Sequence, residues 1–325
     1  MDTANMRRLE PAAVACALIG TVGPARASCG SASCSLMTDR YAQGIGEAHI
    51  GWSADLRLEA VTQDRLRTGT TRLDPGQVTG EEAIERRTRN RNLVTTLTRG
   101  LDREWSVSLR LPIVQRDHAH DLVDEQTGLA DTPERWRFTR VGDVQLLVRR
   151  QRLAEDGASG FALFGGLKLP TGSITVVNAD GSRAERALQP GTGTTDLVLG
   201  IAARHAVGLA DAWLAQAGVS QALNRRESFR PGTRVDLSAG WSHAWSPGLG
   251  SVLQLNWRHR GHDSGAQAEP GNSGSTTLDL SPGITVATGP ASTLYAYLQL
   301  PLYQKVSGVQ LVPRRAFAAG WTQDF

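Results

Sequence analysis

An alternation of apolar and polar residues, repeated in segments of about ten residues from Trp52 onward, constrains the fold of this chain most strongly. The clearest segment is WSVSLRLPI, residues 105–113, in which large apolar side chains occupy every second position. Because neighbouring side chains of a β-strand point to opposite faces, each segment predicts a strand with one apolar and one polar face. Strands of this kind, separated by turn residues, are typical of transmembrane β-barrels.

Twelve such strands can be placed on the chain, and the connections between them alternate in length. Outer-membrane barrels have an even number of strands, short periplasmic turns and longer outside loops. We therefore predict an all-β fold, a single transmembrane antiparallel up-and-down β-barrel, with strands at residues 52–62, 91–100, 104–113, 141–151, 160–169, 194–206, 211–222, 234–245, 250–260, 275–286, 292–300 and 315–325. The long outside loops are predicted at residues 63–90, 114–140, 170–193, 223–233, 261–274 and 301–314.

Composition agrees with a barrel and excludes a helical membrane protein. The mean hydropathy is −0.27, and no run of the chain approaches the 18 or so apolar residues of a transmembrane helix. Only alternate residues of a barrel face lipid, so its mean hydropathy resembles that of a soluble protein. The net charge of +3 is spread through the chain, which gives no support for nucleic-acid binding.

The N-terminal residues predict export. Arg7 and Arg8 precede an apolar stretch at residues 11–23, and Ala25-Arg26-Ala27 supplies a cleavage site. We predict a signal peptide at residues 1–27, a periplasmic segment at residues 28–51 and an outer-membrane barrel at residues 52–325. The periplasmic segment either hangs free or folds into the barrel as a plug.

Cys29 and Cys34 remain after cleavage, with four residues between them. In an exported protein two nearby cysteines predict a small disulfide. A metal site at this pair would need further soft ligands, and the sequence near it offers none.

Aromatic residues lie toward the predicted periplasmic ends of the strands, where amphipathic rings favour the membrane interface. They are Trp52, Trp105, Trp213, Trp241, Trp245, Trp321 and Phe325. Phe325 falls on the apolar face of residues 317–325, the predicted closing strand. As in outer-membrane barrels in general, we expect this terminal aromatic residue to be recognised by the barrel-insertion machinery.

Three stretches carry a resemblance to a known family. GLKLPTGS, residues 166–173, and LQPGTGTTDLVLGIAARH, residues 188–205, resemble the paired LPTG and GTG-x-x-D motifs of outer-membrane transporters grouped with the meta-pathway of phenol degradation. RVGDVQLLVRR, residues 140–150, is similar to the strand that precedes these motifs. The resemblance is best over about residues 138–205 and implies passage of small aromatic or hydrophobic compounds.

The polar faces of the predicted strands collect charged residues of both signs. Such charges must be either hydrated or paired inside the barrel. They form either a salt-bridged interior that stiffens the wall or a charged constriction that filters solutes, and their near balance argues against strong ion selectivity. The predicted lumen-lining residues are Asp55, Arg57, Glu59, Arg110, Asp143, Arg149, Lys168, Asp196, Arg204, Arg234, Asp236, Arg258 and Asp279.

Two predicted outside loops carry further polar clusters. In RDHAHDLVDE the side chains of Asp117, His118, His120 and Asp121 offer ligands for zinc, copper or nickel, although solvated polar loops also contain such clusters without binding a metal. EEAIERRTRNR, residues 81–91, is expected to contact lipopolysaccharide phosphates through its arginines.

No catalytic or nucleotide-binding motif is present in the sequence, so neither an enzyme nor a cofactor is expected. The predicted function is an outer-membrane channel or facilitator for a small aromatic or hydrophobic solute. The alternative is a metal-binding or structural barrel with a closed lumen that acts through its outside loops. A barrel-embedded hydrolase has no sequence motif in its favour.

Overall fold

The structure is a computed structural model that describes residues 45, 50–79, 81, 83–124, 127, 130–155 and 157–325, apart from the side chain of Asp131. The predicted signal peptide, Cys29 and Cys34 lie outside these residues. No helix in the described part of the chain is long and apolar enough to span a membrane.

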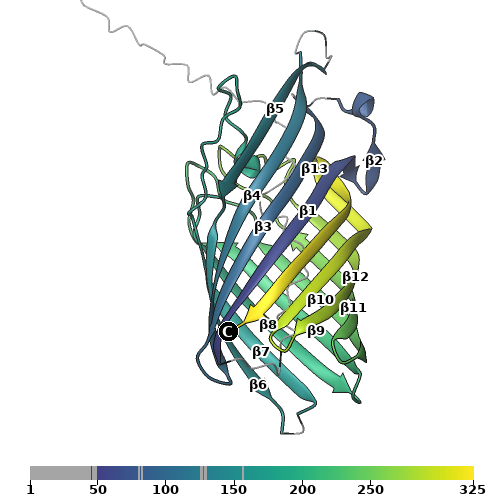
Figure 1. The fold of residues 1–325 in the computed structure, drawn as a ribbon. Coiled ribbons are helices and arrows are strands. Elements are labelled where there is room, and N and C mark those ends of the chain that lie inside the picture. The colour runs from purple at the N-terminus through teal and green to yellow at the C-terminus, as the bar shows by residue number, and fades with distance from the viewer. Residues whose placement is uncertain are drawn as a thin grey trace, which may run out of the picture.

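The described strands form one antiparallel sheet that closes on itself (Figure 1). Neighbours in the wall are consecutive along the chain, and β13 pairs with β1 to complete the barrel. Two shorter elements extend it, because β2 (Thr71–Leu73) pairs with β1 and β5 (Ala130–Val141) pairs with β4. The wall consists of β1 (Gly51–Gly69), β3 (Ala83–Gly100), β4 (Trp105–Val123), β6 (Val144–Leu153), β7 (Ser159–Leu169), β8 (Asp196–Val207), β9 (Asp211–Ala222), β10 (Arg234–Ser246), β11 (Leu249–Arg260), β12 (Ser275–Gly289) and β13 (Ser292–Asp324).

Strand β13 crosses the wall twice. Its 33 residues contain a first limb, up to Val306, that pairs with β12 and a second limb, down to Asp324, that pairs with β1. The limbs reverse direction near Gly308, whose φ of +60° is a left-handed conformation that favours glycine. With both limbs counted, the described wall makes twelve antiparallel passes, which confirms the predicted number. The predicted outside loop at residues 301–314 is wrong, because strand pairing continues through it.

The connections lie as predicted, long at one end of the barrel and short at the other (Figure 1). We call these the loop end and the turn end. The predicted loops at residues 63–90 and 114–140 are too long, because β1, β3, β4 and β5 extend into them. The predicted strands stopped where the outward apolar residues stop, but hydrogen bonding between strands continues beyond that point with polar side chains.

The outer face of the barrel carries an apolar belt. Its leucines are widely exposed, for example Leu58 (61%), Leu109 (46%) and Leu255 (45%). The six predicted interfacial tryptophans are between 37% and 65% exposed and lie toward the turn end. A contiguous exposed apolar surface of this kind is favourable in contact with lipid and unfavourable in contact with water.

The polar faces of the strands point inward, together with two apolar clusters. The first cluster lies near the turn end and consists of Ile45, Ala162, Ala202, Leu214, Val252, Tyr295 and Tyr297. The second lies near the loop end and consists of Val114, Trp136, Phe138, Ala184 and Leu188. Ile45 precedes the wall in sequence and is only 1% exposed, so this residue lies inside the barrel among the side chains of the first cluster.

Candidate functional site

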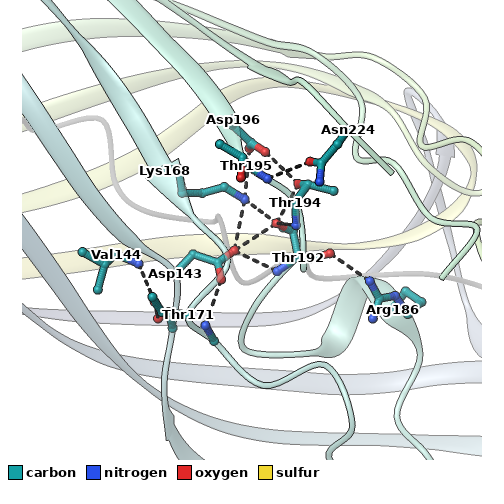
Figure 2. A network of polar contacts seen from close by, with 12 residues as sticks. Asp143, Val144, Lys168, Thr171, Arg186, Thr192, Thr194, Thr195, Asp196 and Asn224 are labelled. Carbon is teal, nitrogen blue, oxygen red and sulfur yellow. Dashed lines mark hydrogen bonds and ion pairs between the residues drawn. The ribbon is translucent and has the colours of Figure 1, made fainter. Parts of the chain in front are cut away.

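The carboxylate of Asp143 is the centre of a polar network inside the barrel (Figure 2). Asp143 lies in the turn just before β6, within the RVGD stretch. Its Oδ2 accepts hydrogen bonds from Lys168 Nζ at 3.0 Å and from the Thr192 backbone N–H at 2.8 Å, and its Oδ1 accepts one from the Gly172 backbone N–H at 3.0 Å. This one carboxylate therefore links β6 and β7 to both ends of the segment between β7 and β8.

Lys168 connects the network to β8. Its Nζ lies 3.0 Å from Asp196 Oδ2 and also donates to Thr192 Oγ1. Asp196 accepts a further hydrogen bond at 2.7 Å from Thr194, which is fully buried. Buried charges are stable only when they are paired and hydrogen-bonded, and this network meets both conditions.

The backbone crosses itself closely at two glycines of the segment. A Cβ atom on Gly172 would lie 2.7 Å from the Cα of Gly191, and one on Gly191 would meet the carbonyl oxygen of Gly172. Any side chain at either position would force the two backbone segments apart. The LPTG and PGTG stretches are thus the points where residues 170–195 leave and rejoin the wall.

Residues 170–195, which we call the inserted loop, fold against the inner face of β4 and β5. Leu188 and Gln189 are at most 1% exposed, and Leu188 belongs to the apolar cluster with Trp136 and Phe138. The buried Arg116 of β4 donates from Nη1 to the Leu188 carbonyl oxygen at 2.6 Å and from Nε to Asn90 Oδ1 at 2.7 Å. The predicted outside loop at residues 170–193 therefore occupies the loop end of the lumen.

A cavity of about 110 Å³ lies next to the Asp143 network. Residues from β1 through β11 line it, so it is part of the lumen rather than a surface groove. The lining includes charged side chains of both signs, among them Glu59, Arg110, Asp143, Lys168, Asp196 and Arg234.

All thirteen predicted lumen residues alternate with the exposed residues of the outer belt and are buried or half-buried. Several form ion pairs or accept hydrogen bonds within the wall. These contacts are Arg57 with Glu59 (3.0 Å), Arg234 and Arg258 with Asp236 (2.9 and 2.7 Å), and Tyr295 Oη and Thr322 Oγ1 with Asp55 (2.9 and 2.8 Å). That these residues line a solute path stays a prediction.

The first apolar cluster, which we call the neck, lies inside the barrel between the level of the cavity and the turn end. Its wall residues come from β7, β8, β9, β11 and β13, and each lies near the turn end of its strand. Ile45 packs among them so tightly that a Cβ atom added to Gly160 would lie 2.5 Å from its Cγ2. The sequence placed residues 28–51 on the periplasmic side, and the periodicity of the strands held no signal for an inserted isoleucine.

The four predicted metal ligands are divided between the two faces of β4. Asp117 and Asp121 face outward, where they pair with Arg135 (2.8 Å) and Arg86 (2.5 Å). The Arg135 hydrogen bond lowers the pKa of Asp117. His118 and His120 point inward and are at most 1% exposed, so their predicted position in a solvated loop is wrong. The sequence missed Glu85, which β3 brings beside them.

No protein-family model and no curated protein sequence matches the chain. The structure is similar to that of an outer membrane channel from Pseudomonas putida F1, with a TM-score of 0.63 and 12% identity, covering 85% of this chain and 96% of that one. The β domain of the Bordetella autotransporter BrkA is less similar, with a TM-score of 0.48 and 12% identity, covering 85% of this chain and 100% of that domain. The first similarity agrees with the predicted fold class, a single β-barrel of the outer-membrane type.

Proposed function

We propose that the protein is an outer-membrane channel through which a small aromatic or hydrophobic solute passes without covalent chemistry. The observation that carries this proposal is a closed barrel with an apolar belt outside and a polar cavity inside. The P. putida outer membrane channel with a similar fold supports it. The resemblance of residues 140–205 to phenol-pathway transporters supports the class of solute.

The neck at the turn end favours a weakly hydrated solute. A hydrated ion loses water when it enters an apolar constriction, and that loss is costly. An uncharged aromatic compound gains contact with Leu214, Val252 and Tyr297 at the same place. The charges around the cavity are of both signs, which gives neither cations nor anions a strong preference.

The inserted loop closes the other side of the cavity and acts as the gate at the loop end. Its two ends are fixed through Asp143, while its middle packs against Trp136 and Phe138. Withdrawal of the middle would expose the cavity without breaking the barrel wall.

The outer surface fits the envelope of a Gram-negative cell. At the loop end β3 exposes Arg86, Arg89 and Arg91 above the apolar belt, where lipopolysaccharide phosphates would bind them. Phe325 is 70% exposed at the turn end, and the barrel-insertion machinery would recognise it there.

The test is current block in planar bilayers with the refolded mature protein. We expect small conductance steps that a neutral aromatic solute interrupts, whereas a charged aromatic solute of equal size interrupts them less. A sugar of similar volume is the control for size. Equal block by all three solutes would contradict an apolar filter, and a folded barrel without any steps would contradict a channel.

A further inference from the structure

A compact group of metal-ligating side chains lies inside the loop end of the barrel. Glu85 of β3 and His118 and His120 of β4 each offer a ligand atom, and the three atoms lie within 4.8 Å of one another. Each side chain is at most 1% exposed. The proposed channel function uses none of them.

Glu85 is the feature that needs an explanation. Both of its carboxylate oxygens are buried and lack a hydrogen-bond partner among the described residues. His118 lies beside it, with Nε2 at 3.4 Å from Oε2, and this Nε2 likewise has no hydrogen-bond partner in the described chain. A buried carboxylate without compensation is costly, and a bound cation would remove that cost.

One ring nitrogen of each histidine contacts a side chain that is not one of the three ligands. Thr88 Oγ1 lies 2.8 Å from His118 Nδ1, and Glu134 Oε2 of β5 lies 3.0 Å from His120 Nε2. These contacts leave Nε2 of His118 and Nδ1 of His120 as the ligand atoms. Metal-binding histidines characteristically engage a hydroxyl, carbonyl or carboxylate through the nitrogen that does not face the metal.

Strand register and packing fix this arrangement. Thr88 pairs with His118 and Glu85 with His120 across β3 and β4, and Glu134 pairs with His120 across β4 and β5. The Trp136 ring lies 4.9 Å from the His120 ring and 5.8 Å from the His118 ring, measured between centroids. The three ligands are therefore preorganised on two adjacent strands, β3 and β4, and β5 supports them through Glu134.

Charged groups of both signs act on the cluster, among them two further carboxylates. Burial and the negative charges of Glu185 and Glu269 raise the pKa of Glu85 well above its ordinary value. Burial, the neighbouring His120 and Arg116 lower the pKa of His118. The outward side chains at this level are Arg86, Arg89, Asp117 and Asp121, so the cluster lies beyond the apolar belt.

We propose that Glu85, His118 and His120 bind one divalent transition-metal ion, for which zinc is the best fit. Two imidazoles and one carboxylate suit zinc, whereas magnesium and calcium favour oxygen ligands throughout. Three protein ligands leave one coordination position for water. The ion joins the extended ends of β3 and β4 and stabilises the loop end of the barrel.

The experiment is a zinc titration of the refolded, chelator-treated full barrel, followed by calorimetry. Cobalt(II) serves as a second probe, because its visible spectrum reports coordination directly. Zinc is added both before and after refolding, so that a closed loop end cannot prevent entry. The variants are Glu85→Gln and His118→Gln, and the matched controls are Asp117→Asn, on the outer face of the same strand, and His259→Gln on β11.

We expect one zinc ion per wild-type chain, with affinity reduced at least tenfold in both ligand variants and unchanged in both controls. Heat-modifiable migration in gels verifies that each variant is folded. If a ligand variant does not fold, Glu134→Gln replaces it, and the loss of this outer contact should weaken zinc about 10- to 100-fold. The proposal is overturned if the folded wild type binds no zinc, or if Glu85→Gln and Glu134→Gln bind it as tightly as the wild type.

Discussion

At the scale of single residues, Asp143 determines whether the inserted loop can stay in the lumen. The residue is 8% exposed. The two backbone N–H groups that donate hydrogen bonds to its carboxylate belong to opposite ends of the loop. Lys168 forms ion pairs with both Asp143 and Asp196. Removing the Asp143 carboxylate therefore loosens the loop and leaves Lys168 with a single buried partner.

Replacing Asp143 by Ala should open the loop end. We expect a larger single-channel conductance, because the two ends of the inserted loop lose their common acceptor. We also expect the free energy of unfolding to fall by about 1–3 kcal/mol for each backbone N–H group, of Gly172 and Thr192, that loses its buried acceptor.

Planar-bilayer recordings and urea unfolding in detergent measure the two effects. The matched control is Asp236→Ala, which also breaks ion pairs inside the barrel, with the half-buried Arg234 and Arg258, but on β10, away from the inserted loop. Equal conductance of the two variants would show that Asp143 does not hold a gate.

Glu85 should make the stability of the metal-free barrel depend on pH. Its pKa is raised in the folded chain, so between the ordinary value of about 4.3 and the raised value the folded state holds a proton that the unfolded state has released. The free energy of unfolding must then fall as pH increases through this interval. In the presence of a chelator, Glu85→Gln should be more stable than the wild type at the upper end of the interval and equal to it below pH 4. A difference that is independent of pH would contradict the raised pKa.

At the scale of elements, β13 shows how the barrel closes without a long final loop. Its first limb completes the pairing with β12, and its second limb supplies the edge that β1 needs. The Gln304 side chain donates to the Pro313 carbonyl oxygen at 2.9 Å, which ties the two limbs together near their reversal. The conformation at Gly308 is therefore a condition for closure.

Replacing Gly308 by Ala should destabilise the barrel more than the same change at Gly69. Both glycines have a positive φ, of +60° and +56°, and an alanine there costs about 1–2 kcal/mol. A Cβ atom at Gly308 would also collide with Asn272 and with the Gly271 carbonyl oxygen, whereas one at Gly69 meets nothing within 4 Å. Urea unfolding monitored by tryptophan fluorescence gives both values, and equal losses would contradict the steric argument.

At the scale of the whole molecule, the lumen has two barriers in series. The neck with Ile45 lies toward the turn end, the inserted loop lies toward the loop end, and the cavity lies between them. Resistances in series add, so the larger one controls the current. Opening one barrier alone leaves the other in control.

Replacing Ile45 by Asp should hydrate the neck and raise the conductance for ions. Combined with Asp143→Ala, the increase should exceed the sum of the two single effects, because both resistances then fall. Single-channel recordings measure all three variants, and Leu209→Asp on an exposed turn is the control for added charge. A double variant that conducts no more than the better single variant would argue against two barriers.

The number of passes and the alternation of loop lengths could be predicted from the sequence. Residues that face lipid are apolar, and they occur at every second position of the strands between Trp52 and Phe325. Strand lengths could not be predicted in this way. Strand pairing continues through polar pairs such as Asn90 with Arg116, beyond the part of the outer face that is apolar. Asp143, Lys168 and Asp196 were predicted as inward charges, but their convergence depends on the path of residues 170–195. Glu85 was missed because its position beside His120 follows from strand register and not from sequence spacing.

The seam between β1 and β13 has a consequence for biogenesis. It pairs Ser53 with Asp324 and ends in a hydrogen bond from the Phe325 backbone N–H to the Trp52 carbonyl oxygen at 2.8 Å. Until β13 is in place, the β1 edge presents unsatisfied donors and acceptors that invite pairing with other chains. Contacts so distant along the polypeptide form slowly. The exposed edge of β1 is therefore open to wrong pairing until the second limb of β13 reaches it.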